Sequence, residues 1–163
     1  MPRPHYRSAY VLGRTPPAAA LALLLIATLA PRSGLAQAAD GDVHASMQCD
    51  RASEPGRVRC TVEARIDGGR TLAWADVEIL ALPDFASALK GRIGPQDALA
   101  RDATSTKWAL ALVARRGGQG EARARVRVVA CDAAPPAASG GPSPSPRCNP
   151  VVVEVKATVS VGG

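Results

Sequence analysis

The stretch Arg57–Ile66, RVRCTVEARI, alternates apolar and polar residues along its whole length. Successive side chains of a β-strand point to opposite sides, so this alternation predicts a strand with one face in a core and one in water. The expected core face consists of Val58, Cys60, Val62, Ala64 and Ile66. Gly68 and Gly69 then supply residues that favour a turn.

Similar two-residue periodicity extends in both directions from this segment. It recurs at 43–49, 104–114, 122–130 and 151–161, and at 71–82 with a phase slip near Asp76 that predicts a bulge. Segments 104–114 and 121–131 are expected to pair as a hairpin through a turn at Gly117–Gly120. Pro95 favours one helical turn. The expected core also includes Trp74, Phe85, Leu89, Ile93 and Trp108.

This organisation predicts an all-β fold. About seven strands with turn signals between them, in roughly 120 residues, are typical of an immunoglobulin-like antiparallel β-sandwich. No internal repeat or heptad pattern is visible. We therefore expect one such domain at 39–163, with a Pro/Ser/Gly-rich loop at 132–147.

The first 38 residues have the features of an export signal. Arg3, Arg7 and Arg14 precede the apolar run 18–30, which is too short for a stable membrane anchor. Small residues at Ala36 and Ala38 favour cleavage after Ala38, with Ala36 as the alternative. The sequence therefore predicts a signal peptide at 1–38 and an exported protein, periplasmic if bacterial or extracellular.

Removal of this segment changes the charge of the protein. The whole chain has a net charge of +6, but four basic residues and no acidic ones lie in 1–38. The 16 basic and 14 acidic residues that remain leave a net charge of only +2. Without a basic stripe interleaved with aromatic residues, nucleic-acid binding is disfavoured.

Hydrolytic and metal chemistry find little support in the mature chain. His44 is its single histidine and lies at the start of the first predicted strand, so a Ser/His or Cys/His centre is disfavoured. Zinc sites usually hold cysteines in tight pairs, whereas the four cysteines here are widely spaced. We expect no metal and no cofactor.

One charge cluster suggests binding. It consists of Arg115, Arg116, Arg123, Arg125 and Arg127. Arg123, Arg125 and Arg127 share one face of a predicted strand, where they favour contact with an acidic partner or surface ligand. The alternative is a solvated sheet face whose like charges prevent edge-to-edge pairing.

The four cysteines predict two disulfides, Cys49–Cys60 and Cys131–Cys148, because an even count is typical of exported chains. Cys49 and Cys60 flank a short polar loop between neighbouring strands, which favours a structural bond. Cys131 and Cys148 enclose the Pro/Ser/Gly-rich loop, and this pair is either a structural link or a redox pair.

The second pair carries a resemblance to a known family. VRVVAC, followed by CNPVVVEVKATVSV, resembles the closing hairpin of the periplasmic N-terminal domain of the thiol:disulfide interchange protein DsbD. The resemblance implies an immunoglobulin-like domain in which Cys131 and Cys148 exchange disulfides with partner proteins and Pro150 matches the family's proline. The family's turn is short, whereas 16 residues separate the two cysteines here.

Two functions therefore remain open. The first is a non-enzymatic binding or accessory protein of unknown partner. The second is a DsbD-like thiol–disulfide oxidoreductase that uses Cys131 and Cys148.

Overall fold

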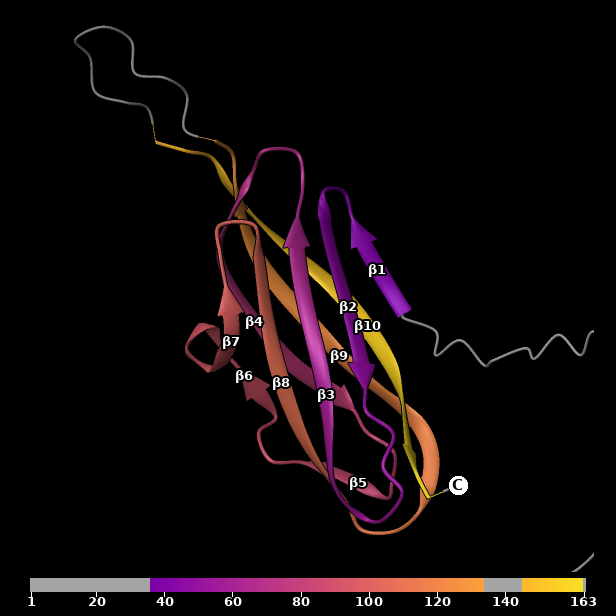
Figure 1. Cartoon of the computed structure of the whole chain (residues 1–163). Coiled ribbons are helices and arrows are strands. Elements are labelled where there is room, and N and C mark those ends of the chain that lie inside the picture. Colours follow the sequence, from indigo (N-terminus) through magenta and orange to yellow (C-terminus); the bar gives the residue numbers. More distant parts are fainter. Residues whose placement is uncertain (1–35, 134–144, 163) are drawn as a thin grey trace, which may run out of the picture. The chain divides into compact units, whose positions relative to one another are not determined.

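The computed structural model describes residues 36–133 and 145–162, which form two antiparallel sheets packed face to face (Figure 1). Sheet A contains, in spatial order, β1 (Ala36–Asp40), β2 (Val43–Cys49), β3 (Gly56–Ile66), β8 (Ser105–Ala114) and β5 (Ala86–Ala88), and β7 (Ala98–Arg101) also pairs with β8. Sheet B contains β10 (Cys148–Val161), β9 (Gly118–Cys131), β4 (Thr71–Ala81) and β6 (Arg92–Ile93). The predicted helical turn is a 3-10 helix, η1 (Pro95–Asp97).

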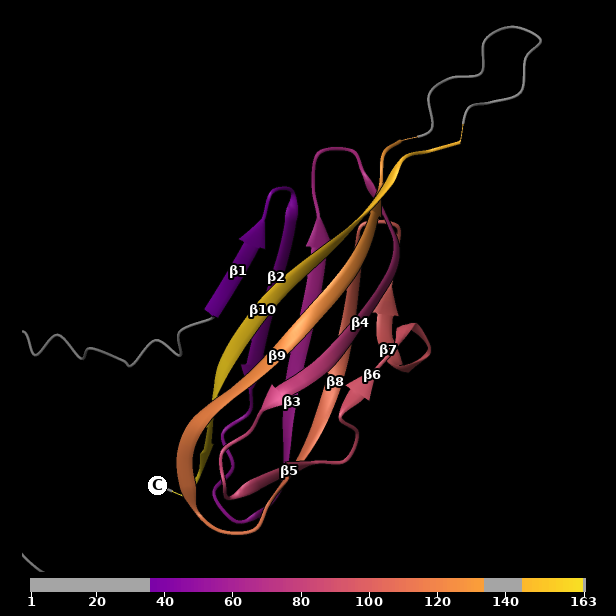
Figure 2. The ribbon, with the colours of Figure 1, turned by 180° about the vertical axis from the view of Figure 1, so that it is seen from behind.

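The strand order is that of an immunoglobulin-like sandwich. The chain runs through β2 and β3 in sheet A, crosses to β4 in sheet B and returns to β8 beside β3. It then ends in sheet B, with β9 beside β4 and β10 beside β9. Figure 2 shows sheet B in front, with β9 between β10 and β4. This arrangement confirms the predicted fold class.

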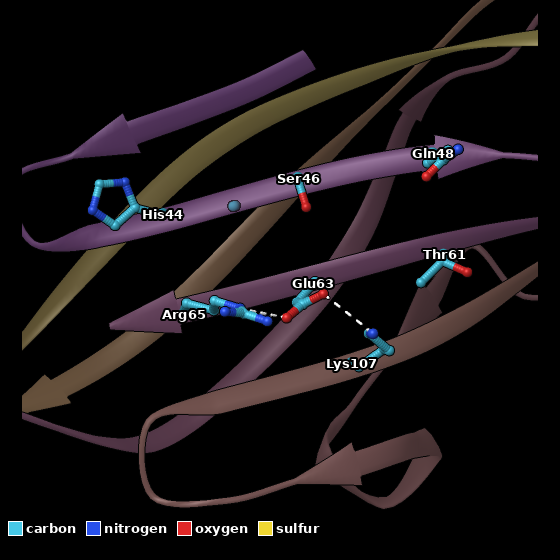
Figure 3. A pocket seen from close by; sticks show the side chains of 8 residues that line it. His44, Ser46, Gln48, Thr61, Glu63, Arg65 and Lys107 are labelled. Carbon is cyan, nitrogen blue, oxygen red and sulfur yellow. Dashed lines mark hydrogen bonds and ion pairs between the residues drawn. The ribbon is translucent and has the colours of Figure 1, made fainter. Parts of the chain in front are cut away.

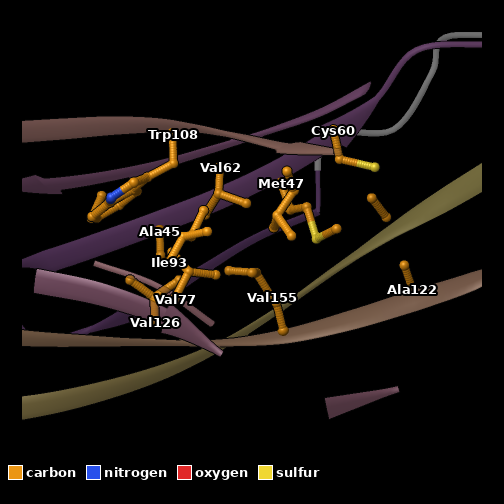
Figure 4. Close-up of a cluster of buried hydrophobic side chains, with 14 of the residues drawn as sticks. Ala45, Met47, Cys60, Val62, Val77, Ile93, Trp108, Ala122, Val126 and Val155 are labelled. Carbon is orange, nitrogen blue, oxygen red and sulfur yellow. The ribbon is translucent and has the colours of Figure 1, made fainter. Parts of the chain in front are cut away.

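The core lies between the two sheets and is built from the inward faces that the sequence predicts. All five residues of the expected core face of β3 are buried. Trp108 is fully buried, and its indole Nε1 donates a hydrogen bond to the Gly94 carbonyl at 2.9 Å, which ties the segment before η1 to the core. Figure 4 shows side chains of both sheets meeting in this layer, among them Met47, Val62, Val126 and Val155.

The predicted hairpin between β8 and β9 is wrong. β8 pairs with β3 in sheet A, whereas β9 pairs with β10 and β4 in sheet B, so the connection crosses from one sheet to the other. Gly118 and Gly120 belong to β9 and not to a turn. A Cβ at Gly118 would lie 2.9 Å from the Phe85 ring, and one at Gly120 would lie 2.8 Å from Pro83. These glycines permit close packing where the chain changes sheets.

The phase slip in β4 lies earlier than predicted. The register with β9 shifts between Leu72 and Trp74, not at Asp76, and shifts again between Ile79 and Ala81. After the first shift Ala75 and Val77 point inward, which places Trp74, Asp76 and Glu78 on the outer face. The assignment of Trp74 to the core is therefore wrong, since its exposed fraction is 37%.

A second core assignment also fails. Leu89 is 59% exposed, whereas Phe85 and Ile93 are buried as predicted. Leu89 follows the short strand β5, where its amide donates a hydrogen bond to Ala111 of β8 at 3.0 Å. Its backbone is therefore fixed to sheet A while its side chain faces solvent.

The predicted signal peptide lies outside the described residues except for Ala36–Ala38. These three residues pair with Met47, Ser46 and Ala45 as part of β1, so cleavage after Ala38 would leave only the last two residues of that strand. Most of the Pro/Ser/Gly-rich loop, 134–144, also lies outside them. Within the described residues, no helix is long and apolar enough to cross a membrane.

Candidate functional site

Cys131, the last residue of β9, and Cys148, the first residue of β10, are directly opposite each other, and a disulfide joins them. The two cysteines differ in exposure, since Cys131 is only 6% exposed whereas Cys148 is exposed to solvent. Thr71 and Arg70 contact the backbone on the Cys131 side. The Thr71 hydroxyl donates to the Cys131 carbonyl at 3.5 Å, and Arg70 Nη2 donates to the Ala130 carbonyl at 3.2 Å.

Apolar side chains lie beside this disulfide on the outer face of sheet B. Val129 of β9 is two residues before Cys131 and on the same face of the strand. The register places Trp74 of β4 and Pro150 of β10 on either side of Val129. Val152 follows on β10 and is 51% exposed. We call Trp74, Val129, Pro150 and Val152 the disulfide-end patch. An exposed cluster of this kind, bordered by charged residues, is typical of an interaction surface.

The next row of sheet B contains a buried carboxylate held by two arginines. Asp76 is 1% exposed, although it lies on the outer face, because the side chains around it cover it. Arg127 donates Nε to Oδ1 at 2.8 Å and Nη2 to Oδ2 at 2.6 Å, and Arg92 donates Nε to Oδ2 at 2.5 Å. Burial alone would raise the pKa of Asp76, but the hydrogen bonds and charges of Arg127 and Arg92 outweigh it and lower that pKa.

The predicted arginine face is therefore mostly neutralised by acidic neighbours. Arg127 is paired with Asp76, and Arg125 lies 3.4 Å from Glu154 and 4.0 Å from Glu78. Arg123 alone of the three forms no ion pair within the described residues, and it stands opposite Lys156. These acidic residues lie on β4 and β10, far from β9 in sequence, so the run of arginines gave no sign of them. The three side chains share a face as predicted, but they do not form a free cationic surface.

The other disulfide lies in sheet A. Cys49 of β2 and Cys60 of β3 are partners in register, and Cys60 is fully buried among the core residues of its strand. The bond joins β2 to β3 at the base of the loop between them, on the side that faces the core. Its position supports a structural role.

A hollow of about 490 Å³ lies on the outer face of sheet A, over β2, β3 and β8 (Figure 3). Glu63 lies at its centre, 2.5 Å from Arg65 Nε and 3.3 Å from Lys107 Nζ. Burial would raise the pKa of Glu63, but hydrogen bonds from Arg65 and Lys107 lower it overall. The ion pairs leave the centre of the hollow without a free charge.

His44 also lines this hollow and pairs with Asp67 outside the strand, at 3.1 Å from Nε2 to Oδ2. Ser46 lies on the same face of β2, but among the described residues no hydroxyl group is hydrogen-bonded to His44. The nucleophile–base contact that a hydrolase needs is thus missing from this part of the chain. The described residues also contain no cluster of three or more histidine, cysteine or acidic side chains placed to hold a metal ion.

The comparisons with known proteins add no relative. No protein-family model, no curated protein and no solved structure matches this chain.

Proposed function

We propose that this chain is an exported, disulfide-stabilised immunoglobulin-like domain that acts as a non-enzymatic binding or accessory protein through the disulfide-end patch. The observation that carries the proposal is the exposure of Trp74 and Val152 on a sheet face that is otherwise covered by ion pairs. Aromatic side chains dominate the binding energy of many protein interfaces, and a tryptophan is costly to leave in water. The partner would be a protein with a matching apolar surface.

A site-specific photo-cross-linker tests this surface. With the cross-linking residue at position 152 we expect a discrete adduct in cells that export the protein, and we expect Trp74→Ser to remove it. The matched control places the same residue at Lys156, which is exposed on the same face of β10 but outside the patch. Equal adducts from both positions, or an adduct unaffected by Trp74→Ser, would exclude the patch as the binding surface.

Export is tested separately by the N-terminus of the secreted chain. Processing after Ala38 yields a chain beginning at Ala39, and processing after Ala36 yields one beginning at Gln37. Recovery of only the intact chain, retained in the cytoplasm, would contradict the export proposal while leaving the patch to be judged by cross-linking.

A second function is favoured by the unequal exposure of the two cysteines. In a thiol–disulfide exchange, a partner thiolate would attack the exposed Cys148 sulfur, and the bond to Cys131 would break with Cys131 leaving as the thiolate. The partner's second thiolate would then attack the partner sulfur of this mixed disulfide and release Cys148. The partner dithiol is thereby oxidised to a disulfide, and Cys131 and Cys148 are reduced with two electrons and two protons.

The reduction potential of the Cys131–Cys148 pair separates the two functions. Structural disulfides of secreted proteins have potentials below about −300 mV, whereas exchange-active pairs lie near about −200 mV. A Cys49→Ala/Cys60→Ala variant leaves the second disulfide as the only one to titrate. A value in the lower range eliminates the exchange function.

A further inference from the structure

Several arginine side chains gather at the end of the sandwich opposite the Cys131–Cys148 disulfide, and of these only Arg115 was part of the cluster expected from the sequence. Arg57 and Arg59 lie on the outer face of β3, about 7 Å apart along the strand. Together with Arg51 they line a hollow of about 460 Å³ formed by the β2–β3 loop. Arg115 follows Ala114, which is the register partner of Gly56. We call Arg51, Arg57, Arg59 and Arg115 the basic end.

The charges of the basic end are not neutralised in the way that those of sheet B are. All four arginines are exposed, and within the described residues none of them forms an ion pair. Asp50 and Glu54 line the hollow with three of the arginines, and Asp84, which lies near Arg115, is already paired with Arg116 at 2.6 Å. Positive charge is therefore in excess. The basic end therefore attracts anions, whereas Arg125 and Arg127 on sheet B already hold carboxylates.

Backbone hydrogen bonds fix the loops that carry these side chains. The Ala52 amide donates to Ser160 at 3.1 Å, and the Gly162 amide donates back to Ala52 at 2.9 Å, so the β2–β3 loop is joined to the end of β10. The Arg115 amide donates to Phe85 at 2.8 Å. A charge cluster on a fixed backbone loses less conformational entropy on binding than one on a free tail.

The surface beside the arginines is apolar. Arg59 stands opposite Ala111 of β8, which is exposed, and Leu89 is hydrogen-bonded to Ala111 with its own side chain in solvent. Guanidinium groups next to an exposed leucine suit a surface that offers phosphates at the level of an apolar layer. A lipid headgroup layer has this chemistry, and a soluble polyanion does not.

We propose that the basic end binds the phosphate groups of an anionic phospholipid membrane surface, with Leu89 entering the headgroup layer. Arginine suits this role because its planar guanidinium forms paired hydrogen bonds to phosphate oxygens. The site is independent of the disulfide-end patch, which lies at the other end of the molecule, so either proposal can fail without the other.

The test measures binding of residues 33–163 to phospholipid vesicles. This segment is a compact unit by itself, and it lacks the apolar run 18–30, which would bind membranes on its own. We expect the domain to sediment with phosphatidylglycerol vesicles at low salt and not with phosphatidylcholine vesicles. Binding should fall steeply as salt is raised, because the attraction to the anionic surface is screened.

Arginine variants locate the site. Each basic residue near an anionic surface contributes roughly fivefold to binding, so Arg57→Ser/Arg59→Ser should weaken it by about 25-fold. The matched control, Arg123→Ser/Arg147→Ser, removes two exposed arginines that form no ion pair among the described residues and lie outside the basic end. This control removes the same amount of positive charge, but outside the basic end, where only long-range attraction to the membrane is lost. It should therefore weaken binding by no more than about twofold.

Three results would overturn the proposal. They are no sedimentation of the unaltered domain with phosphatidylglycerol vesicles, an equal loss for both double variants, and binding to soluble polyphosphate without binding to vesicles. Thermal melts verify that each variant is folded. Should Arg57→Ser/Arg59→Ser not fold, the loop pair Arg51→Ser/Arg115→Ser carries the same expectation, since neither residue lies within a strand.

Discussion

Asp76 is the residue on which the outer face of sheet B depends. Its carboxylate is buried and accepts hydrogen bonds from Arg127 of the neighbouring strand and from Arg92 of the edge strand β6. β6 has only two residues and two backbone partners in β4, so this side-chain contact is a substantial part of what holds it. A single acidic residue thus joins three strands.

The variant Asp76→Asn tests this role. It keeps the side-chain volume but removes the charge that both arginines contact, and hydrogen bonds to charged groups contribute about 1.5–3 kcal/mol. We expect the free energy of unfolding to fall by about 2 kcal/mol. Urea denaturation measures the change, with Glu78→Gln on the same face as the control, because its contact with Arg125 is 4.0 Å long and exposed. Similar losses for both variants would show that Asp76 has no special role.

Gly118 is required for a different reason, the space that it leaves. Phe85 is buried against the position that a Cβ on Gly118 would occupy, 2.9 Å away, so Gly118→Ala forces the ring or the strand to move. Such overpacking costs about 1–3 kcal/mol. Gly91→Ala is the matched control, since a Cβ there meets nothing within 4 Å. Thermal unfolding compares the two, and a Gly118→Ala variant as stable as Gly91→Ala would contradict the packing argument.

Each disulfide joins two adjacent strands of one sheet, and neither connects sheet A to sheet B. The two sheets are therefore held together by the apolar core and by chain connections such as the β8–β9 crossing. The disulfides instead secure the two hairpins, β2–β3 and β9–β10. Loss of either bond should lower stability without separating the sheets.

The Cys49–Cys60 bond allows a quantitative test at this scale. Linking two residues that are 11 apart restricts the unfolded chain by about 3 kcal/mol on the chain-entropy estimate. Cys49→Ala/Cys60→Ala should therefore lose about 3 kcal/mol of unfolding free energy and keep its β-sheet circular dichroism spectrum. A spectrum of an unfolded chain in the absence of denaturant would mean that the bond is needed to form the sandwich, and not merely to stabilise it.

Charge is distributed unevenly over the molecule as a whole. Three aspartates lie at the end with the Cys131–Cys148 disulfide. Asp42 and Asp132 pair with Arg70, and Asp102 accepts hydrogen bonds from its own turn. The opposite end carries the four arginines of the basic end. The low net charge of residues 39–163, +2, conceals this asymmetry, because it sums positive and negative groups from both ends.

Four carboxylates with lowered pKa values predict a fold that loses stability in acid. The pKa values of Asp76, Glu63 and Asp97 are lowered, and that of Asp102 falls from 3.8 to about 2 because Ser105 and Thr104 donate hydrogen bonds to it. A lowered folded pKa means that the stabilisation is complete above the unfolded pKa, about 4. It is lost as the pH falls through the folded pKa values.

We therefore expect the melting temperature to be level from pH 7 to about pH 5 and to fall between about pH 4 and pH 2. Thermal melts across this range provide the measurement. The variant Asp76→Asn should show a shallower fall, since one of the titrating carboxylates is gone. Stability that declines instead between pH 7 and pH 5 would contradict the assignment of the acid transition to these carboxylates.

The sequence by itself determined the fold class, the inward face of each long strand except β4, and the cysteine pairs that bond. Two-residue periodicity is local, and for β3, β8, β9 and β10 it is unbroken, so each strand specifies its own buried face. The cysteine pairs were visible because each encloses a single loop. Where the alternation breaks, as in β4, local pattern placed Trp74 in the core, although it belongs to the outer face.

Only the tertiary structure decided which strands are neighbours and which charges are left unpaired. The glycines after β8 indicated a turn, but close approach to Phe85 and Pro83 directs β9 to the other sheet. That crossing sets Arg127 beside Asp76, whereas the register partners of Arg57 and Arg59 in β8 are the apolar residues Val113 and Ala111. Partners in a sheet come from distant parts of the chain, so whether an arginine is neutralised or free to bind depends on strand order, which periodicity along the sequence does not encode.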